Sequence, residues 1–318
     1  MYEPYPAGSR VAFFGDSLTR LGGCMLRVAA QYRALFPERD VRFFNVGISG
    51  GGLAAANLYL DAWLAPIRPT HVVLAFGVND AHALRANQAA PDAVAEANRV
   101  DNASAAFREG YLALTERIET LGAKVAVRAT TPYDDTVRTD GAVTSVPGNG
   151  DAFRRIAAAI RSVAASRGLP CLDDFARMSA RLLEGEPLFR QDRVHPTDLG
   201  HWCLAETLLE AQGLPIPEFK PQDEVAAESG LGDWFNRAQQ VANILSAEWH
   251  FVRDETLDIS AKLAKVRTWL EANGGKTDAA PPLPFLIRLA EDYLRDKPQE
   301  AALRAAIDSN GQNQRELP

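Results

Sequence analysis

The chain has 318 residues, with 34 lysine and arginine residues against 41 aspartate and glutamate residues, and its formal net charge is −7. Hydrophobic residues make up 47% of the chain, which is enough for one large buried core or two smaller ones. This acidic balance argues against nucleic acid as the main partner, because the chain has no basic stripe to neutralise phosphates. The sequence also predicts no membrane span, since no apolar run is long enough for one.

The N-terminal sequence and the cysteines favour a cytoplasmic location. The first ten residues, MYEPYPAGSR, contain no apolar segment of the kind that secretory signals have. The three cysteines, Cys24, Cys171 and Cys203, lack the paired spacing of zinc sites, and their odd number argues against a disulfide framework. We therefore expect small buried thiols in a reducing compartment and a cytoplasmic protein.

Short apolar runs alternate with longer amphipathic segments as far as about residue 210. The runs predict five strands, at Arg10–Gly15, Val41–Val46, His71–Phe76, Lys124–Ala129 and Leu169–Leu172. Apolar residues at helical spacing lie between them, for example over Ala105–Leu121 and Phe153–Arg167. Alternating strands and helices predict an α/β protein with a parallel sheet and helices on both of its faces. Such sheets bind their ligands at the carboxyl ends of the strands.

The sequence changes character after residue 214, where we expect the first domain to end. Residues 215–232 are rich in proline, glycine and charge, which predicts a linker. No strand-like run follows, and residues 233–318 are expected to form a C-terminal helical subdomain.

The expected C-terminal helices carry large apolar stripes. Apolar residues recur at helical spacing over Trp234–Trp249 and Ile259–Leu270, and a third helix is expected near Pro284. Three short helices hide this much apolar surface poorly by themselves, so we expect them to dock on a larger surface. That surface is either the first domain of the same chain or a second copy, and a homo-oligomer is one of the two expectations.

Polar residues and glycines that suit catalysis follow the expected strands. They lie in the segments GDSLT at 15–19, NVGISG at 45–50, GVND at 77–80 and DRVHP at 192–196. A serine, a glycine, an asparagine and an Asp/His pair should therefore meet at one edge of the sheet. Acyl transfer needs such a set: a nucleophile, donors for an oxyanion, a base and a group that orients the base.

These four segments, in this order, resemble the blocks of the SGNH superfamily, also called GDSL-type esterases and lipases. The resemblance covers roughly residues 8–212. It implies a three-layer α/β/α sandwich with five parallel strands in flavodoxin-like order. It also implies a small-molecule ester as the substrate, with no metal and no cofactor.

The resemblance implies a catalytic triad of Ser17, His195 and Asp192. Ser17 would be the nucleophile, His195 the general base, and Asp192 the group that orients the imidazole. Two simpler interpretations stay open. Ser17 lies before an expected helix and could be its N-cap, and His195 could be an incidental histidine in a proline-flanked surface turn.

The resemblance also implies an oxyanion hole built from the backbone N–H of Ser17, the backbone N–H of Gly50 and the side-chain amide of Asn79. Glycine suits this role because it lets a backbone approach the substrate closely. Gly47 in the same loop is an alternative to Gly50. Asn79 could instead be an Asx-turn residue.

A second serine competes with Ser17 for the role of nucleophile. Gly47-Ile-Ser49-Gly-Gly51 matches the G-x-S-x-G nucleophile elbow of α/β-hydrolases, and it follows a strand. We reject Ser49 because the elbow follows only the second strand and no HGGG-type loop precedes it. The close pair Asp192 and His195 also fits a triad whose acid and base come from one turn.

The substrate pocket is less well defined by the sequence. Candidate substrate-binding residues are Asp16, His82, Tyr133 and Val194, although Asp16, like Asp80, is also a candidate loop-stabilising acceptor. Loops over 81–101 and 131–151 are expected to line the rim.

These assignments predict a serine esterase acting on short-chain esters, with acetylated carbohydrates as one candidate class. Lysophospholipase, thioesterase and acyltransferase activities at the same site are alternatives. A non-catalytic binding or scaffold protein on an SGNH core is an alternative of another kind.

Overall fold

The computed structural model describes residues 2–86, 93–136, 149–253 and 261. The chain divides into two compact units, Met1–Ala242 and Asn243–Pro318. In the second unit the described residues are the C-terminal part of one helix and Ala261.

The first unit is built on a five-stranded sheet. Its strands are β1 (Arg10–Gly15), β2 (Arg42–Gly47), β3 (His71–Ala75), β4 (Lys124–Arg128) and β5 (Cys171–Leu172). All neighbouring pairs are parallel, and the strand order is β2-β1-β3-β4-β5. This order confirms the predicted flavodoxin-like sheet, and the expected strands match the observed ones to within a few residues.

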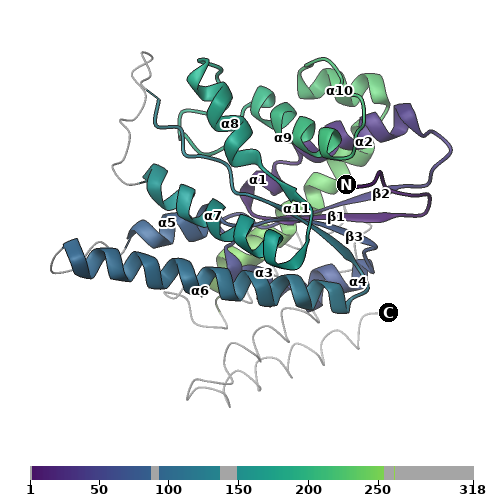
Figure 1. The fold of residues 1–318 in the computed structure, drawn as a ribbon. Helices are drawn as coiled ribbons and strands as arrows, with labels where there is room; N and C mark the ends of the chain where they lie inside the picture. The colour runs from purple at the N-terminus through teal and green to yellow at the C-terminus, as the bar shows by residue number, and fades with distance from the viewer. Residues whose placement is uncertain (1, 87–92, 137–148, 254–260, 262–318) are drawn as a thin grey trace. The chain divides into compact units, whose positions relative to one another are not determined.

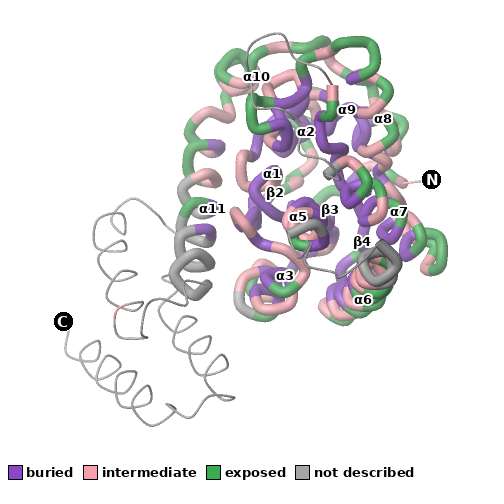
Figure 2. Tube along the Cα trace, turned by 90° about the vertical axis from the view of Figure 1, so that its left-hand side faces the viewer, coloured by how far each residue is buried: buried purple, intermediate pink, exposed green. Residues whose placement is uncertain are grey.

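The central strands β1, β3 and β4 are buried along most of their length (Figure 2), and most of their residues are apolar. Gly15 at the end of β1 is level with Gly47 of β2 and with Ala75 of β3. The three segments that leave these strands therefore start side by side. This register brings Ser17, Gly50 and Asn79 to one edge of the sheet.

Helices cover both faces of the sheet (Figure 1). One face carries α2 (Gly23–Leu35), α8 (Asp174–Leu183) and α9 (Asp198–Ala211), and the short α1 (Ser17–Arg20) follows β1 directly. The other face carries α3 (Leu53–Tyr59), the π-helix η1 (Leu60–Leu64), α4 (Ala65–Ile67), α5 (Val78–Ala86), α6 (Ala93–Thr120) and α7 (Asn149–Arg167). These two helical layers and the sheet form the predicted three-layer sandwich.

Two segments expected to be irregular contain helices. Helix α10 (Gln222–Ser229) lies inside the expected linker and packs on α2, with Gly230 closing it at φ 65°. All of the described residues of 81–101, expected as a rim loop, belong to α5 and α6. In the other expected loop, 131–136 are irregular, and α7 begins at Asn149.

Helix α11 (Gly232–Arg253) contains the whole of the first expected C-terminal helix, Trp234–Trp249. Trp234 and Ala238 in its first turns pack on the core between α2, α9 and the sheet. The expected helices at Ile259–Leu270 and near Pro284 lie outside the described residues, so the assembly through them stays an expectation. None of the described helices is both long and apolar enough to cross a membrane.

Candidate active site

The turn after β1 presents a serine hydroxyl at the edge of the sheet. Asp16 is the N-cap of α1, and its Oδ1 accepts a hydrogen bond from the backbone N–H of Leu18 at 3.0 Å. Because the cap is Asp16, the Ser17 side chain is not needed to close the helix. The Ser17 hydroxyl instead lies 2.9 Å from Nε2 of His195.

The imidazole of His195 links Ser17 to a carboxylate. Its Nδ1 lies 2.8 Å from Oδ2 of Asp192. The other oxygen, Oδ1, accepts the backbone N–H of His195 at 2.8 Å and that of Val194 at 3.0 Å. Partial burial raises the pKa of the Asp192 carboxyl, but these N–H groups and the imidazole outweigh burial, so the pKa lies below its ordinary value. The carboxylate therefore stays ionised at neutral pH.

A short antiparallel contact holds the turn that carries Asp192 and His195. Phe189 and Pro196 form a β-bridge, and the Arg190 N–H donates to the carbonyl of His195 at 2.8 Å. The N–H of Arg193 closes the turn on the carbonyl of Arg190 at 2.9 Å. These contacts limit the positions that the His195 backbone can adopt.

The loop after β2 contains two glycines, and the structure gives a different reason for glycine at each position. Gly50 has φ 71°, in the left-handed region that glycine enters readily. A Cβ on Gly47 would lie 2.1 Å from the backbone nitrogen of Arg20, so Gly47 lets β2 end directly against α1. Gly47 therefore has a packing role of its own. Ser49, the alternative nucleophile, is half-buried in the same turn.

The Asn79 side chain is oriented by this loop. Its Nδ2 donates to the carbonyl of Gly51 at 2.8 Å, which fixes which end of the amide carries the N–H groups. One of the two amide hydrogens makes this bond, and the amide has a second one to donate. Asn79 thus lies beside the turn that contains Gly50.

A comparison with known protein families gives a single assignment. The model of the GDSL-like lipase/acylhydrolase family matches residues 13–203. The chain belongs to this family. As a GDSL-like esterase, it is a hydrolase that acts on ester bonds. A comparison with curated protein sequences finds no match.

Solved structures of related fold include esterases. BT4096, a gut microbial diltiazem-metabolizing enzyme, is 26% identical, with a TM-score of 0.59 over 67% of this chain and 48% of that one. The chain therefore spans about half the length of BT4096. The acetylxylan esterase Axe2 from Geobacillus stearothermophilus is 18% identical, with a TM-score of 0.54 over 68% of this chain and 99% of that one. LAE5, an alpha/beta hydrolase enzyme from the metagenome of Lake Arreo, Spain, is 22% identical, with a TM-score of 0.51 over 66% and 97%. The last two show the fold alone.

In this GDSL-like esterase, the buried Asp16 and the partly buried Asp80 support the loops around the site. Burial raises the pKa of the Asp16 carboxyl to about 7, and nearby Asp80 acts in the same direction, against the Leu18 N–H. Burial also raises the pKa of Asp80, whose Oδ1 accepts the N–H of Leu53 at 3.0 Å, where α3 begins. Asp16 is 1% exposed, so its carboxyl holds the turn and has little surface to offer a substrate.

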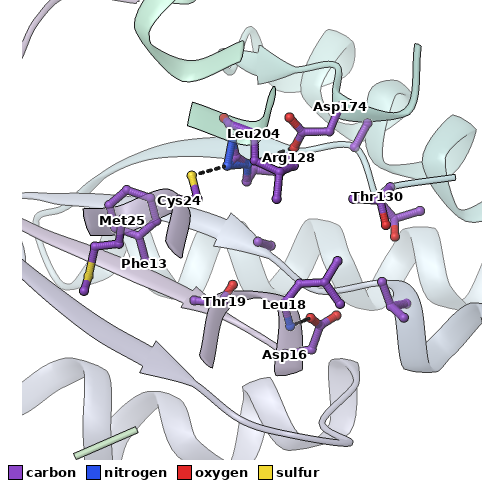
Figure 3. Close-up of a pocket in the computed structure, with 14 residues that line it drawn as sticks. Phe13, Asp16, Leu18, Thr19, Cys24, Met25, Arg128, Thr130, Asp174 and Leu204 are labelled. Atoms are coloured by element: carbon purple, nitrogen blue, oxygen red, sulfur yellow. Dashed lines mark hydrogen bonds and ion pairs between the residues drawn. The ribbon is translucent and has the colours of Figure 1, made fainter. Parts of the chain in front are cut away.

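Asp16 also lines a small pocket of about 40 Å³ (Figure 3). Arg128 at the end of β4 forms one wall, and its Nε donates to Oδ2 of Asp174 at 2.8 Å. The guanidinium also contacts Cys24 Sγ at 3.4 Å and the carbonyl of Leu204. A buried charge is tolerated only when it is paired and hydrogen-bonded, as Arg128 is. These contacts of Arg128 tie β4 to α8 and α9 near the turn that contains Asp16 and Ser17.

The expected pocket residues are mostly packed among aromatic rings. The rings of His82 and Phe153 meet edge to face, with centroids 5.1 Å apart, and Tyr133 lies 5.8 Å from the same Phe153 ring. Tyr133 and Val194 are each 7% exposed. Three of the four candidate pocket residues therefore belong to one packed wall or to the Asp192–His195 turn.

His201 in α9 is a buried histidine whose pKa is lowered by its surroundings. It is 2% exposed, and neither ring nitrogen has a hydrogen-bond partner among the described residues. Burial lowers the pKa of His201 to about 3, and the cations Arg27, Arg190 and Arg128 act in the same direction, as does His195. In the unfolded chain, His201 therefore takes up a proton as the pH falls below about 6.5, whereas in the folded chain it stays neutral until a much lower pH.

We expect His201→Leu to reduce the acid sensitivity of the fold. In the parent protein this group lowers the free energy of unfolding as the pH falls from about 6.5 to about 3, by up to about 1.4 kcal/mol per pH unit. Leucine cannot take up the proton, so this contribution disappears in the variant. Urea unfolding at several pH values measures it, and equal slopes in both proteins would contradict the expectation.

Two supporting residues of the site were given no role in the sequence analysis. Asn45 accepts the N–H of Gly47 at 3.0 Å and donates to the carbonyl of Arg20 at 3.1 Å, which joins the Gly50 loop to α1. An asparagine two residues before a glycine at a strand end is a signal for such an Asx turn. Arg193, within the Asp192–His195 turn, is the second, and no sequence pattern indicates its role.

Proposed function

We propose that the protein hydrolyses short-chain carboxylic esters through an acyl-enzyme intermediate on Ser17. The observation that carries the proposal is the continuous series of contacts from Ser17 Oγ to His195 Nε2 at 2.9 Å and from His195 Nδ1 to Asp192 Oδ2 at 2.8 Å. A serine hydroxyl becomes an effective nucleophile when an oriented imidazole accepts its proton.

In the acylation step, Ser17 Oγ attacks the ester carbonyl carbon while His195 Nε2 takes the hydroxyl proton. The resulting imidazolium is stabilised by the ionised Asp192. Negative charge develops on the carbonyl oxygen, where the N–H groups of Ser17 and Gly50 and the amide of Asn79 are proposed to donate hydrogen bonds. His195 then gives its proton to the departing alcohol oxygen, and the acyl group stays on Ser17.

In the deacylation step, water replaces the alcohol. His195 takes a proton from the water as its oxygen attacks the acyl carbon, and the second tetrahedral species uses the same donors. Collapse of this species returns the proton to Ser17 Oγ and releases the carboxylic acid. If an alcohol takes the place of water, the same site carries out acyl transfer.

A short acyl group is favoured by the packed wall beside the site. The rings of Tyr133 and His82 lie against Phe153, and Val194 is almost fully buried, so little apolar surface is open for a long chain. Acetyl esters, including acetylated carbohydrates, are the candidate class. The neighbour Axe2 is described as an acetylxylan esterase, and BT4096 as a diltiazem-metabolizing enzyme.

A panel of p-nitrophenyl esters and natural substrates tests the proposal. We expect kcat/KM to be highest for acetate and to fall steadily through butyrate, octanoate and palmitate, with acetate release from acetylated xylooligosaccharides. A maximum at octanoate or longer, or with lysophospholipid or acyl-thioester substrates, would favour the lipase or thioesterase alternative. No turnover of any ester, with Ser17 unreactive, would favour a binding protein.

A further inference from the structure

Arg193 stands between the proposed acid and the proposed base in a backbone conformation that arginine rarely adopts. Its φ is 66°, and among the described residues the only other non-glycine with positive φ is Arg68. A side chain with a Cβ is disfavoured in this left-handed region, and such positions persist when the surroundings over-determine them. Arg193 is also 4% exposed, although arginine is rarely buried without specific partners.

The Arg193 side chain reaches a different segment of the protein. Its Nη1 donates to the carbonyl of Asp134 at 2.7 Å and to the carbonyl of Thr136 at 2.9 Å. The backbone joins the same segment, since the Asp134 N–H donates to the carbonyl of Arg193 at 3.1 Å. One residue thus makes three hydrogen bonds across a sequence separation of almost sixty residues.

Residues 134–136, which make these bonds with Arg193, form a turn with its own hydrogen bonds. This turn lies next to the packed aromatic residues Tyr133 and Phe153. Asp134 Oδ1 accepts the N–H of Thr136 at 3.0 Å and also the Thr136 hydroxyl, so the two carbonyls are presented together. Tyr133, the residue before this turn, packs on Phe153. The Arg193 contacts therefore connect the Asp192–His195 turn to a wall that is anchored in α7.

We propose that Arg193 is a positioning residue that clamps the Asp192–His195 turn onto residues 134–136 and so keeps the imidazole within reach of Ser17. The inference rests on the proposed function, because it assigns to Arg193 the placement of the proposed acid and base. Asp192 and His195 are partly exposed, with side-chain exposures of 49% and 34%, so packing on them alone does not hold the turn. The backbone bonds within the turn fix its shape, and the buried Arg193 side chain adds a link from the turn to residues 134–136.

If Arg193 mattered only for its backbone conformation, the expected effect of its replacement would differ from that expected for a side-chain clamp. If the left-handed backbone were all that mattered, glycine would serve at least as well as arginine, because it enters that region without a Cβ penalty. If the side-chain clamp matters, glycine relieves the strain but frees the turn. The variant Arg193→Gly separates the two.

We expect Arg193→Gly to lower kcat for p-nitrophenyl acetate roughly 10- to 100-fold, since small displacements of a catalytic group slow turnover strongly, with KM changed less than about twofold. Arg193→Lys should recover most of kcat, since a single nitrogen serves both carbonyls. Millimolar guanidinium should partly restore Arg193→Gly by occupying the vacated position.

Arg68→Gly is the matched control, because Arg68 also has a left-handed φ of 49° but lies exposed at the end of α4. It should keep full kcat and show no response to guanidinium. Melting curves of all variants separate slow turnover from loss of fold. If Arg193→Gly does not fold, Arg193→Gln, whose amide is too short for both carbonyls, carries the same test against Arg193→Lys.

Full kcat in folded Arg193→Gly or Arg193→Gln would overturn the clamp, as would equal loss in the lysine variant. Ser17→Ala, assayed in parallel, keeps this outcome apart from failure of the proposed function. An inactive parent protein, or an active Ser17→Ala, would refute the proposed function. A Ser17-dependent parent with fully active Arg193→Gly would refute the clamp alone.

Discussion

Replacement of Ser17 by alanine is expected to lower ester turnover by at least about 10³-fold, because the covalent route through the acyl-enzyme is lost. The fold should persist, since the N-cap of α1 is the Asp16 carboxyl and the substitution removes the hydroxyl contact to His195 but keeps the backbone bonds of Ser17. Steady-state kinetics on p-nitrophenyl acetate measure the effect, and an unchanged melting temperature shows that the variant is folded.

Ser49→Ala is the control for this first prediction. Ser49 lies in the G-x-S-x-G sequence that resembles a nucleophile elbow, so it is the serine that a different triad would use. Its replacement should cost far less turnover than that of Ser17. An inactive Ser49→Ala together with an active Ser17→Ala would show that the proposed nucleophile is wrong.

Asn79→Ala is expected to lower kcat by roughly 10²- to 10³-fold with a modest change in KM, because an oxyanion donor acts mainly on the charge that develops during reaction. The contact of Asn79 Nδ2 with the Gly51 carbonyl holds the amide beside the Gly50 turn before substrate arrives. The donor therefore needs little reorganisation when the carbonyl oxygen becomes negative.

Asn57→Ala is a matched control for Asn79→Ala. Asn57 also donates from Nδ2 to a backbone carbonyl, that of Leu53 at 3.1 Å, but it lies on α3 and pairs with Arg117 of α6. Its loss should affect stability and leave kcat near that of the parent protein. A similar fall of kcat in both variants would mean that Asn79 acts through loop structure and not as a donor.

The sheet was readable from the sequence because its strands are buried on both faces, which leaves continuous apolar runs such as RVAFFG at 10–15. The edge strand β5 was predicted too long, to begin at Leu169. In the structure the N–H of Leu169 bonds to the carbonyl of Ala164 past Gly168, at φ 63°, so this residue still closes α7. The hydrogen bond that ends α7 therefore determines the conformation of Leu169, although this residue belongs to an apolar run typical of a strand.

The helix α10 was missed because its boundaries resemble a linker. Pro221 precedes it and Gly230 follows it, and both residues were counted as signs of irregular structure. Proline before a helix and glycine after it are also ordinary helix boundaries. The short polar segment between them carries no strong apolar stripe, so only its packing on α2 decides the outcome.

The catalytic candidates could be named from the sequence because each belongs to a short motif at a strand end. The residues that support these candidates could not be named from the sequence, because the groups they bind are distant in the chain. Arg128 pairs with Asp174, and Arg193 bonds to the carbonyls of Asp134 and Thr136. Nothing in the local pattern around Arg128 or Arg193 predicts burial, since each depends on a segment that the fold brings to it.

The central claim is that Ser17 is the nucleophile, and labelling with a serine-directed fluorophosphonate tests it most directly. Trypsin separates the two candidate serines, because Ser17 falls in the peptide Val11–Arg20 and Ser49 in a later one. We predict one adduct per chain on Val11–Arg20, with loss of esterase activity in proportion to labelling and no adduct in His195→Ala. An adduct on the Ser49 peptide, or full activity after complete labelling of Ser17, would contradict the account.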